Sequence, residues 1–432
     1  MNKMYLKNKI LIAACFIYAG MSLNAQSIAS GTSVMRASID DCYEWSRENF
    51  PLIHQLDIVD KATHYNVSNA SNGNLPQINL NGQASYQSAV TNFPIDLPNV
   101  EVPTVGKDQY KIYGEVYQPL TNFSNVKTLK RQIEINGEIE KQQVEVDLYK
   151  LKDRINQTYF GILLISEKIE QFEIIISDLD SALVKVEAAI SNGTATLTEK
   201  SLLNVERISI MQQIDENRSN RKAFLSMLSI LTGKTISETT VLDKPKILTG
   251  TSEIRRPELQ LFKLQNDAID IKSKQLSNRL LPNLGLFAQG GYGRPALNFL
   301  SNDFDFYYIG GVKFNWNISN YYGHKNAKKL LQTVSDKIST QRETFLRNTE
   351  LSQAQQSSEI LKYEGLVKTD NKIVNLRADI LKTAKVQLDN GLITTIDYVK
   401  YLNDVNRAKQ NLLLHGTQLL LAQHNLKITT GN

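Results

Sequence analysis

The side chains that most often carry catalysis or hold metal ions are few in this chain and lie far apart. Its 432 residues include five histidines and two cysteines, Cys15 and Cys42. The histidines form no paired helical metal-binding motif; they are His54, His64, His324, His415 and His424. A single cysteine outside the N-terminal segment excludes an internal disulfide and a cysteine-based zinc site, so Cys42 is expected to be a small buried residue.

The glycine-rich run from Gly290 to Gly293 is the segment closest to a nucleotide-binding loop. It lacks the following lysine and the strand-to-helix spacing that such loops require. We therefore expect no catalytic residue, no cofactor site and no metal site. The sequence does not indicate an enzyme.

The N-terminal segment has the layout of a secretory signal peptide. Three lysines precede an apolar run from Ile10 to Leu23, and small and polar residues follow it. Residues 1–25 are therefore predicted to be removed on export. Cys15 also resembles a lipoprotein processing site, but the apolar run continues past it, so lipidation ranks second.

Charge and hydropathy exclude two further classes of protein. The net charge of +5 includes the three lysines of the signal peptide, and no basic tract follows, so a nucleic acid is not an expected partner. Beyond residue 23 no apolar run approaches the length of a membrane helix. Any membrane-embedded part must therefore consist of β-strands.

Similar segments recur at fixed distances, which predicts an internal repeat. Leu75–Leu80 and Leu281–Leu286 are 206 residues apart, whereas Gly193 and Gly391 are 198 residues apart. The predicted organisation is a signal peptide (1–25), a first structural repeat (26–240), a linker (241–252) and a second structural repeat (253–432).

Each repeat is predicted to contain a helix, a β-hairpin (75–120 or 281–318) and a long helical hairpin (125–233 or 324–431). No proline interrupts residues 125–191, and apolar residues there recur at helical spacing. A helix of that length reaches roughly 100 Å. Helices this long must pack lengthwise in a coiled-coil-like bundle.

Apolar and polar residues alternate along the predicted strands. In the first strand Ile78 and Leu80 alternate with Gln77 and Asn79. This alternation is typical of a membrane barrel strand with one lipid-facing side, although soluble sandwiches also contain such strands. The predicted lipid-facing residues are Ile78, Leu80, Leu284, Leu286, Phe314 and Trp316.

Four strands cannot close a barrel, and an open edge in lipid leaves backbone groups unsatisfied. Several chains must therefore share one barrel. Two chains give eight strands and an interior filled by side chains, whereas three give twelve strands and a water channel. A conduit favours the trimer.

Several short motifs, in this order and duplicated, resemble the TolC-type outer-membrane efflux protein family over essentially the whole mature chain. They are the Leu-Pro pairs that open the first strand of each hairpin, the segments Gln118–Leu120 and Arg256–Leu259, and the turns Asn192–Thr194 and Asn390–Thr394. The resemblance implies a mainly α-helical fold with a membrane β-barrel: a homotrimer of twelve strands and twelve long helices.

The resemblance also implies a function. The protein would be the outer-membrane channel of a tripartite efflux or secretion system, passively conducting substrates, with its barrel among outer-membrane lipid and its helices in the periplasm. The helical tips would meet a periplasmic adaptor protein attached to an inner-membrane transporter. The tip residues are Gly193, Thr194, Gly391, Leu392 and Thr394.

In this family, carboxylates beyond the second tip narrow the tunnel entrance. Asp397 matches that position, and Glu199 stands at the equivalent place in the first repeat. Lys400 stands where a second gate carboxylate is often found. Three copies of Asp397 would form an anionic ring able to hold cations, whereas a solvated helix face is the alternative role of this residue.

Two alternatives stay open. A type I protein secretion conduit would have the same organisation, because the inner-membrane transporter selects the substrate. An exported trimeric coiled-coil structural protein would explain the helices but not the repeated hairpins. The sequence does not identify the substrate, the adaptor or the resting state of the channel.

Overall fold

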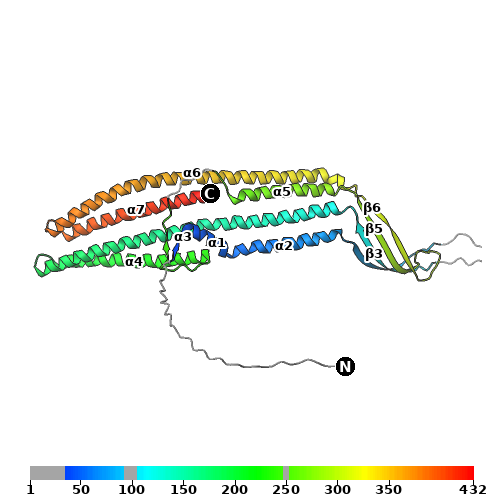
Figure 1. The fold of residues 1–432 in the computed structure, drawn as a ribbon, viewed down its shortest axis with the longest axis horizontal. Helices are drawn as coiled ribbons and strands as arrows, with labels where there is room; N and C mark the ends of the chain where they lie inside the picture. The colour runs from blue at the N-terminus through cyan, green and yellow to red at the C-terminus, as the bar shows by residue number, and fades with distance from the viewer. Residues whose placement is uncertain (1–34, 92–104, 247–252) are drawn as a thin grey trace, which may run out of the picture.

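The computed structural model describes residues 35–91, 105–246 and 253–432. The predicted signal peptide, Cys15, most of the first hairpin loop and residues 247–252 of the predicted linker lie outside these ranges. Long helices run side by side, and a small β-sheet extends from one end of them (Figure 1). The chain is mainly helical with few strands, as the sequence predicts.

Proline separates the two helices that precede the sheet. Ser38 caps α1 (Ile39–Asn49), and Pro51 opens a short 3₁₀ turn, η1 (Pro51–Ile53), before α2 (His54–Ser71). A proline fixes φ and lacks an N–H group, so it is favoured in the first turn of a helical segment. A second 3₁₀ turn, η2 (Asn72–Asn74), leads into the sheet.

The sheet contains four antiparallel strands in the order β2-β3-β5-β6. Their bounds are β2 (Gln77–Tyr86), β3 (Asp108–Pro119), β5 (Asn283–Arg294) and β6 (Asp305–Asn315). Within the described residues, β2 and β6 each pair on one side only, so the sheet of one chain is open at both edges.

Five helices form the body of the molecule beyond α2. They are α3 (Phe123–Ser191), α4 (Leu197–Thr232), α5 (Pro257–Asn278), α6 (Asn320–Asp389) and α7 (Thr395–Thr430). The helix α6 lies along one flank, and α2 and α4 lie along the opposite flank (Figure 1). No helix among the described residues is both long and apolar enough to cross a membrane.

A two-stranded parallel ladder ties the start of the described chain to the predicted linker. In it β1 (Arg36–Ala37) pairs with β4 (Val241–Leu242). The single hydroxyl hydrogen of the buried Tyr159 of α3 is shared between the carbonyl oxygens of Ala37 (2.9 Å) and Asp243 (2.7 Å). One tyrosine therefore holds both strands on α3, an arrangement that the sequence pattern does not reveal.

Four apolar clusters among the described residues hold the helices together, and two of them are large. The first surrounds Tyr159 in the middle of the molecule and includes Cys42, Ile155 and Leu228. Cys42 is fully buried, as predicted, and burial raises the pKa of its thiol to about 12, so it is unreactive at neutral pH. The second cluster lies toward the helical tips and joins α3, α4 and α7.

Candidate functional site: helical tips and a two-faced sheet

The two helical turns at the tips have the same backbone geometry. Gly193 has φ 72° and Gly391 has φ 70°, which L-residues with a side chain rarely adopt. At each tip, two N–H groups bond back to carbonyls at the end of the preceding helix. The longer-range of the two runs from Thr194 N to Ala189 O (2.9 Å) at the first tip and from Leu392 N to Gln387 O (2.8 Å) at the second. These are Schellman motifs, which satisfy carbonyls that the helix leaves unpaired.

The space around both glycines is open. A Cβ atom built at Gly193 or Gly391 meets no atom within 4 Å. Backbone conformation, and not crowding within the chain, therefore requires glycine at the tips.

Both predicted gate carboxylates take part in helix capping. Thr394 caps α7, and its N–H and hydroxyl both donate to Asp397 (3.2 and 2.7 Å), whose own N–H donates to the threonine hydroxyl (3.2 Å). Thr196 and Glu199 form the same capping box at the start of α4. A capping box satisfies two otherwise unpaired N–H groups, so each carboxylate has a structural role in one chain.

Hydrogen bonds from Thr394 and the nearby Lys400 charge lower the pKa of Asp397, which is fully exposed. The carboxylate is therefore charged at neutral pH. Lys400 itself is exposed on α7, one turn beyond Asp397. The structure brings Asp397 and Lys400 close enough for their charges to interact, but it places both at the surface of the isolated chain.

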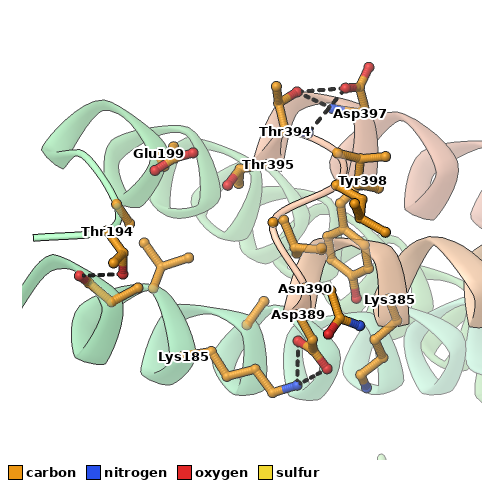
Figure 2. A pocket seen from close by; sticks show the side chains of 18 of the residues that line it. Lys185, Thr194, Glu199, Lys385, Asp389, Asn390, Thr394, Thr395, Asp397 and Tyr398 are labelled. Carbon is orange, nitrogen blue, oxygen red and sulfur yellow. Dashed lines mark hydrogen bonds and ion pairs between the residues drawn. The ribbon is translucent and has the colours of Figure 1, made fainter. Parts of the chain in front are cut away.

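A cavity of about 940 Å³ separates the two tips. Figure 2 shows its lining, with Thr194 and Glu199 on one side and Thr394 and Asp397 on the other. The Lys185 ammonium on α3 bonds both carboxylate oxygens of Asp389 on α6 at 2.7 Å (Figure 2). This ion pair joins the two hairpins near their tips, and sequence analysis did not predict it because 204 residues separate its members.

An ion pair also joins the two helices of each hairpin, farther from the tip. Arg207 of α4 bonds Asp180 of α3 at 2.6 Å, and Arg377 of α6 bonds Asp404 of α7 at 2.5 Å. Both pairs span 27 residues. The charges are reversed, because the first hairpin carries its arginine after the turn and the second carries it before the turn.

The strand register gives the sheet two different faces. Ile78 lies opposite Val116, and Leu286 lies opposite Val312, so apolar side chains share one face. Gln77 lies opposite Tyr117 and Asn79 lies opposite Glu115 on the other face. Side chains of adjacent residues alternate between faces, so this separation continues along the strands, although Phe287 of β5 and Ile309 of β6 lie on the polar face.

The predicted lipid-facing residues lie on the apolar face or just beyond it. Ile78 and Leu80 are 79% and 78% exposed, and Phe314 and Leu286 are also exposed, whereas Leu284 is half-buried opposite Phe314. Trp316 follows the end of β6, and its indole N–H donates to the Leu280 carbonyl at 3.0 Å. The apolar side chains have no covering partner among the described residues of this chain.

The described residues contain no group of three His, Cys, Asp or Glu side chains that could hold a metal ion. The buried His424 packs against Phe160 with ring centres 5.2 Å apart, and burial lowers the pKa of His424 to about 4. Its ring is therefore neutral at pH 7 and belongs to the core.

Solved structures share this arrangement over nearly the whole chain. A membrane protein from Pseudomonas aeruginosa matches with a TM-score of 0.66 at 14% sequence identity, over 92% of this chain and 91% of that chain. The outer membrane protein VceC of Vibrio cholerae matches with a TM-score of 0.64 at 12% identity, over 91% and 96%. The MtrE outer membrane channel of Neisseria gonorrhoeae, in its open state, matches with a TM-score of 0.64 at 12% identity, over 91% and 89%.

No protein-family model matches this chain, and no curated protein sequence does. The similarity is therefore one of fold, and it covers 91% or 92% of this chain in these three structures. It confirms the coarser part of the expected fold: the chain is mainly helical with a few strands and has the fold of the outer-membrane channel proteins.

Proposed function

We propose that the protein is the outer-membrane channel of a tripartite efflux or secretion system and works as a homotrimer. The observation that carries this proposal is the open sheet, which has one apolar and one polar face and continues into long helices. In lipid, the apolar face and the two unpaired edges would both need partners. In a barrel shared by three chains, the apolar face would contact lipid, and each edge strand would pair with a strand of a neighbouring chain.

A ring of chains requires an apolar surface and an edge strand on each of two opposite flanks, and both flanks of this molecule have them. On one flank β6 continues into α6, which exposes Leu351, Leu361 and Leu376. On the opposite flank, α4 exposes Val205 and Ile208, and α2 leads into the edge strand β2. Unlike flanks that join head to tail generate a closed ring when the rotation closes. Three copies would then enclose twelve strands and a tunnel of helices.

The tips are proposed to contact a periplasmic adaptor attached to an inner-membrane transporter. Leu197 and Leu392 are 72% and 74% exposed there, beside Gly193, Thr194 and Gly391. Large exposed apolar side chains rimmed by polar groups favour a protein partner. This assignment applies to both tips, since both combine a glycine turn with an exposed leucine.

The entrance is proposed to be regulated at Asp397, Glu199 and Lys400. In a trimer, three copies of Asp397 around the axis would favour cations over anions. The Lys185–Asp389 pair would hold the two tips of each chain together when the entrance is narrow. Its side chains are half-exposed, and such pairs contribute about 0–1 kcal/mol, so the contact can open without a large energetic cost.

The polar face of the sheet and the structural similarity favour a conduit over an exported coiled-coil scaffold. No catalytic role is proposed. Efflux of small molecules and secretion of a protein through a type I system would use the same channel, because the inner-membrane transporter selects the substrate. The proposed location is the outer membrane, with the helices in the periplasm.

The first test is fractionation of cells that produce the full chain, followed by measurement of the oligomeric mass in detergent. Recovery of a trimer from the outer membrane supports the proposal. A soluble trimer would favour the exported coiled-coil scaffold, and a monomer in any fraction would contradict the shared barrel.

A further inference from the structure

The loop between β5 and β6 exposes large apolar side chains at the end of the sheet away from the helices (Figure 1). It comprises residues 295–304, all of which the structure describes. Leu297, Phe299 and Leu300 are 55%, 59% and 39% exposed, and Phe304 is 45% exposed. Clustered exposed apolar side chains mark surfaces that contact a protein or a membrane. The loop therefore has the composition of a contact surface.

Phe304 holds this loop on the apolar face of the sheet. Its ring stacks on Tyr292, with ring centres 5.5 Å apart, and lies 6.2 Å from the ring centre of Tyr110. Tyr292 lies an even number of residues from Leu286 in β5, and Tyr110 lies an even number from Val116 in β3, so both tyrosines belong to the apolar face. The loop therefore bends toward the apolar side of the sheet and away from its polar side.

Hydrogen bonds tie the loop to the other hairpin and satisfy part of its backbone. The Asn302 side chain accepts a hydrogen bond from the N–H group of Gly106, just before β3, at 2.7 Å. Asn298 accepts two more within the loop, from Leu300 N on its side chain (3.1 Å) and from Ser301 N on its carbonyl (3.2 Å). Backbone groups that are already paired lose less when water is removed from around them. The loop is therefore suited to a partly dehydrated environment.

A charged pair lies at the base of the loop among aromatic rings. Arg294 forms an ion pair with Asp108, where β5 ends and β3 begins. The Arg294 guanidinium lies 5.4 Å from the ring centre of Tyr110 and 5.3 Å from that of Phe304. Aromatic rings are enriched at membrane interfaces, and arginine keeps its charged group at that level while its stem lies along apolar surface. This arrangement fits the level of the lipid headgroups.

From these contacts we infer that residues 295–304 form an interfacial anchor, a loop whose apolar side chains insert into the outer leaflet of lipid beside the barrel. Leu297, Phe299 and Leu300 contact the upper part of the acyl chains. Lipid is the occupant, and not an extracellular protein, because Phe304 joins the loop to the face that contacts lipid in the proposed barrel. The inference rests on the proposed function, since only a membrane barrel places that face in lipid.

The test uses the full chain, purified as a trimer and reconstituted in phosphatidylcholine vesicles. Phe299→Cys supplies a reactive thiol for a nitroxide spin label, because Cys42 is buried and its thiol is unreactive at neutral pH. The chain without the introduced cysteine should take up no label. Spin-label relaxation measures collisions with oxygen, which concentrates in lipid, and with a nickel chelate, which stays in water. Two neighbouring residues at the start of β6 supply matched references, Phe306→Cys on the apolar face and Asp305→Cys on the polar face.

We expect oxygen collisions to dominate at Phe299→Cys, as at Phe306→Cys, and nickel collisions to dominate at Asp305→Cys. Nickel access at Phe299→Cys equal to that at Asp305→Cys would place the loop in water and overturn the anchor. Access of neither reagent would show that protein covers the loop, which would overturn it as well. Nickel access at Phe306→Cys would instead place the apolar face itself in water and refute the shared barrel, so failure of the proposed function is a separate result.

Substitutions of Phe304 in the labelled Phe299→Cys chain test how the loop is held. Phe304→Ser removes the ring that packs on Tyr110 and Tyr292, so nickel access to the label should rise. Phe304→Tyr keeps a ring of similar size and should leave access unchanged. Since Phe304 lies in a loop, both variants should remain trimeric by mass in detergent. A trimeric Phe304→Ser variant with unchanged access would overturn the assignment of this ring as the attachment of the anchor.

Discussion

The two helical hairpins have nearly equal lengths and matching tips, yet they differ sharply in burial. Helix α3 has 69 residues and α6 has 70, and each is followed by a helix of 36 residues. Buried side chains occur along the whole of α3, from Val126 to Val186, whereas the described residues of α6 bury only Ile338, Thr349, Asp370 and Ala384.

Packing explains this difference. Helix α3 packs against α1, α2, α4, α5 and α7, whereas the extensive contacts of α6 are with α7 and α5, with the Lys185–Asp389 ion pair as an additional contact to α3. Tyr398 and Leu402 of α7 join the apolar cluster of the first hairpin, so α7 lies between that hairpin and α6. Helix α3 therefore lies at the centre of the chain, and α6 forms a flank that another chain can cover.

The largest expected effect comes from a charge on the α6 flank. Leu361 is 70% exposed in the single chain. If a neighbouring chain covers it, Leu361→Glu places three unpaired carboxylates in an apolar interface, each costing several kcal/mol. The trimer should dissociate, as measured by oligomeric mass in detergent.

The matched control is Leu361→Met, which keeps an apolar side chain of similar volume and should leave the trimer intact. Val205→Glu on the opposite flank should dissociate it as well. A stable trimer carrying Leu361→Glu would refute the assignment of α6 to the interface.

The tip glycines should respond equally, because their backbone geometry is the same. Gly193→Val and Gly391→Val should each destabilise their hairpin by about 1–2 kcal/mol, the strain of a left-handed residue with a branched side chain. Hydrogen exchange of the adjoining helix ends measures this effect. Asparagine tolerates the conformation better, so Gly193→Asn and Gly391→Asn should cost less; an unequal response of the two tips would show that a partner contact distinguishes them.

Substitutions within the capping box can distinguish two roles of Asp397, as a charge at the channel entrance and as part of a helix cap. Asp397→Asn removes the charge and should reduce the preference of the channel for cations, whereas Thr394→Ala removes the cap and should leave that preference unchanged. Glu199→Gln is the corresponding change in the first hairpin. Single-channel reversal potentials in a salt gradient measure the preference, and equal effects of Asp397→Asn and Thr394→Ala would favour a purely structural role.

The lowered pKa of Asp397 gives a pH prediction. The pKa of Asp397 in the folded chain is lower than the value of about 3.9 for the unfolded chain. The carboxylate therefore stays charged at every pH above about 3.9 and gains its proton only as the pH falls through the lower, folded pKa. Cation preference should therefore stay constant from about pH 8 to pH 5. A decline within that interval would assign the preference to another group.

The smallest effects are expected at the ion pairs of reversed polarity. Asp180–Arg207 and Arg377–Asp404 are partly exposed, so each should contribute about 0.2–1 kcal/mol. Exchanging Arg377 and Asp404 should preserve stability, whereas Asp404→Arg alone places two cations together and should lower it. A double-mutant cycle on thermal unfolding measures the coupling, and an exchange as harmful as the single change would indicate that the orientation of the pair matters.

Local patterns in the sequence predicted much of the fold. Alternation at Ile78 and Leu80 indicated a two-faced strand, and the absence of proline over residues 125–191 indicated a long helix. The ladder of β1 and β4 escaped prediction, since two-residue strands have no periodicity. Which helix would be central and which peripheral also escaped, because periodicity identifies an apolar face and not the neighbour that covers it.

Less of the candidate site could be predicted from the sequence, for a similar reason. The spacing of Thr394 and Asp397 is that of a capping box, so this role could have been recognised from the sequence. The Lys185–Asp389 pair could not, because residues 204 positions apart meet only through the packing of α3 and α6.

Planar-bilayer recording of the purified protein tests the shared channel most directly. Trimers inserted from detergent should give discrete, ion-conducting steps, and these steps should disappear when Leu361→Glu prevents assembly. Trimers that insert but carry no current, or monomers that conduct as well as trimers, would contradict a channel formed jointly by several chains.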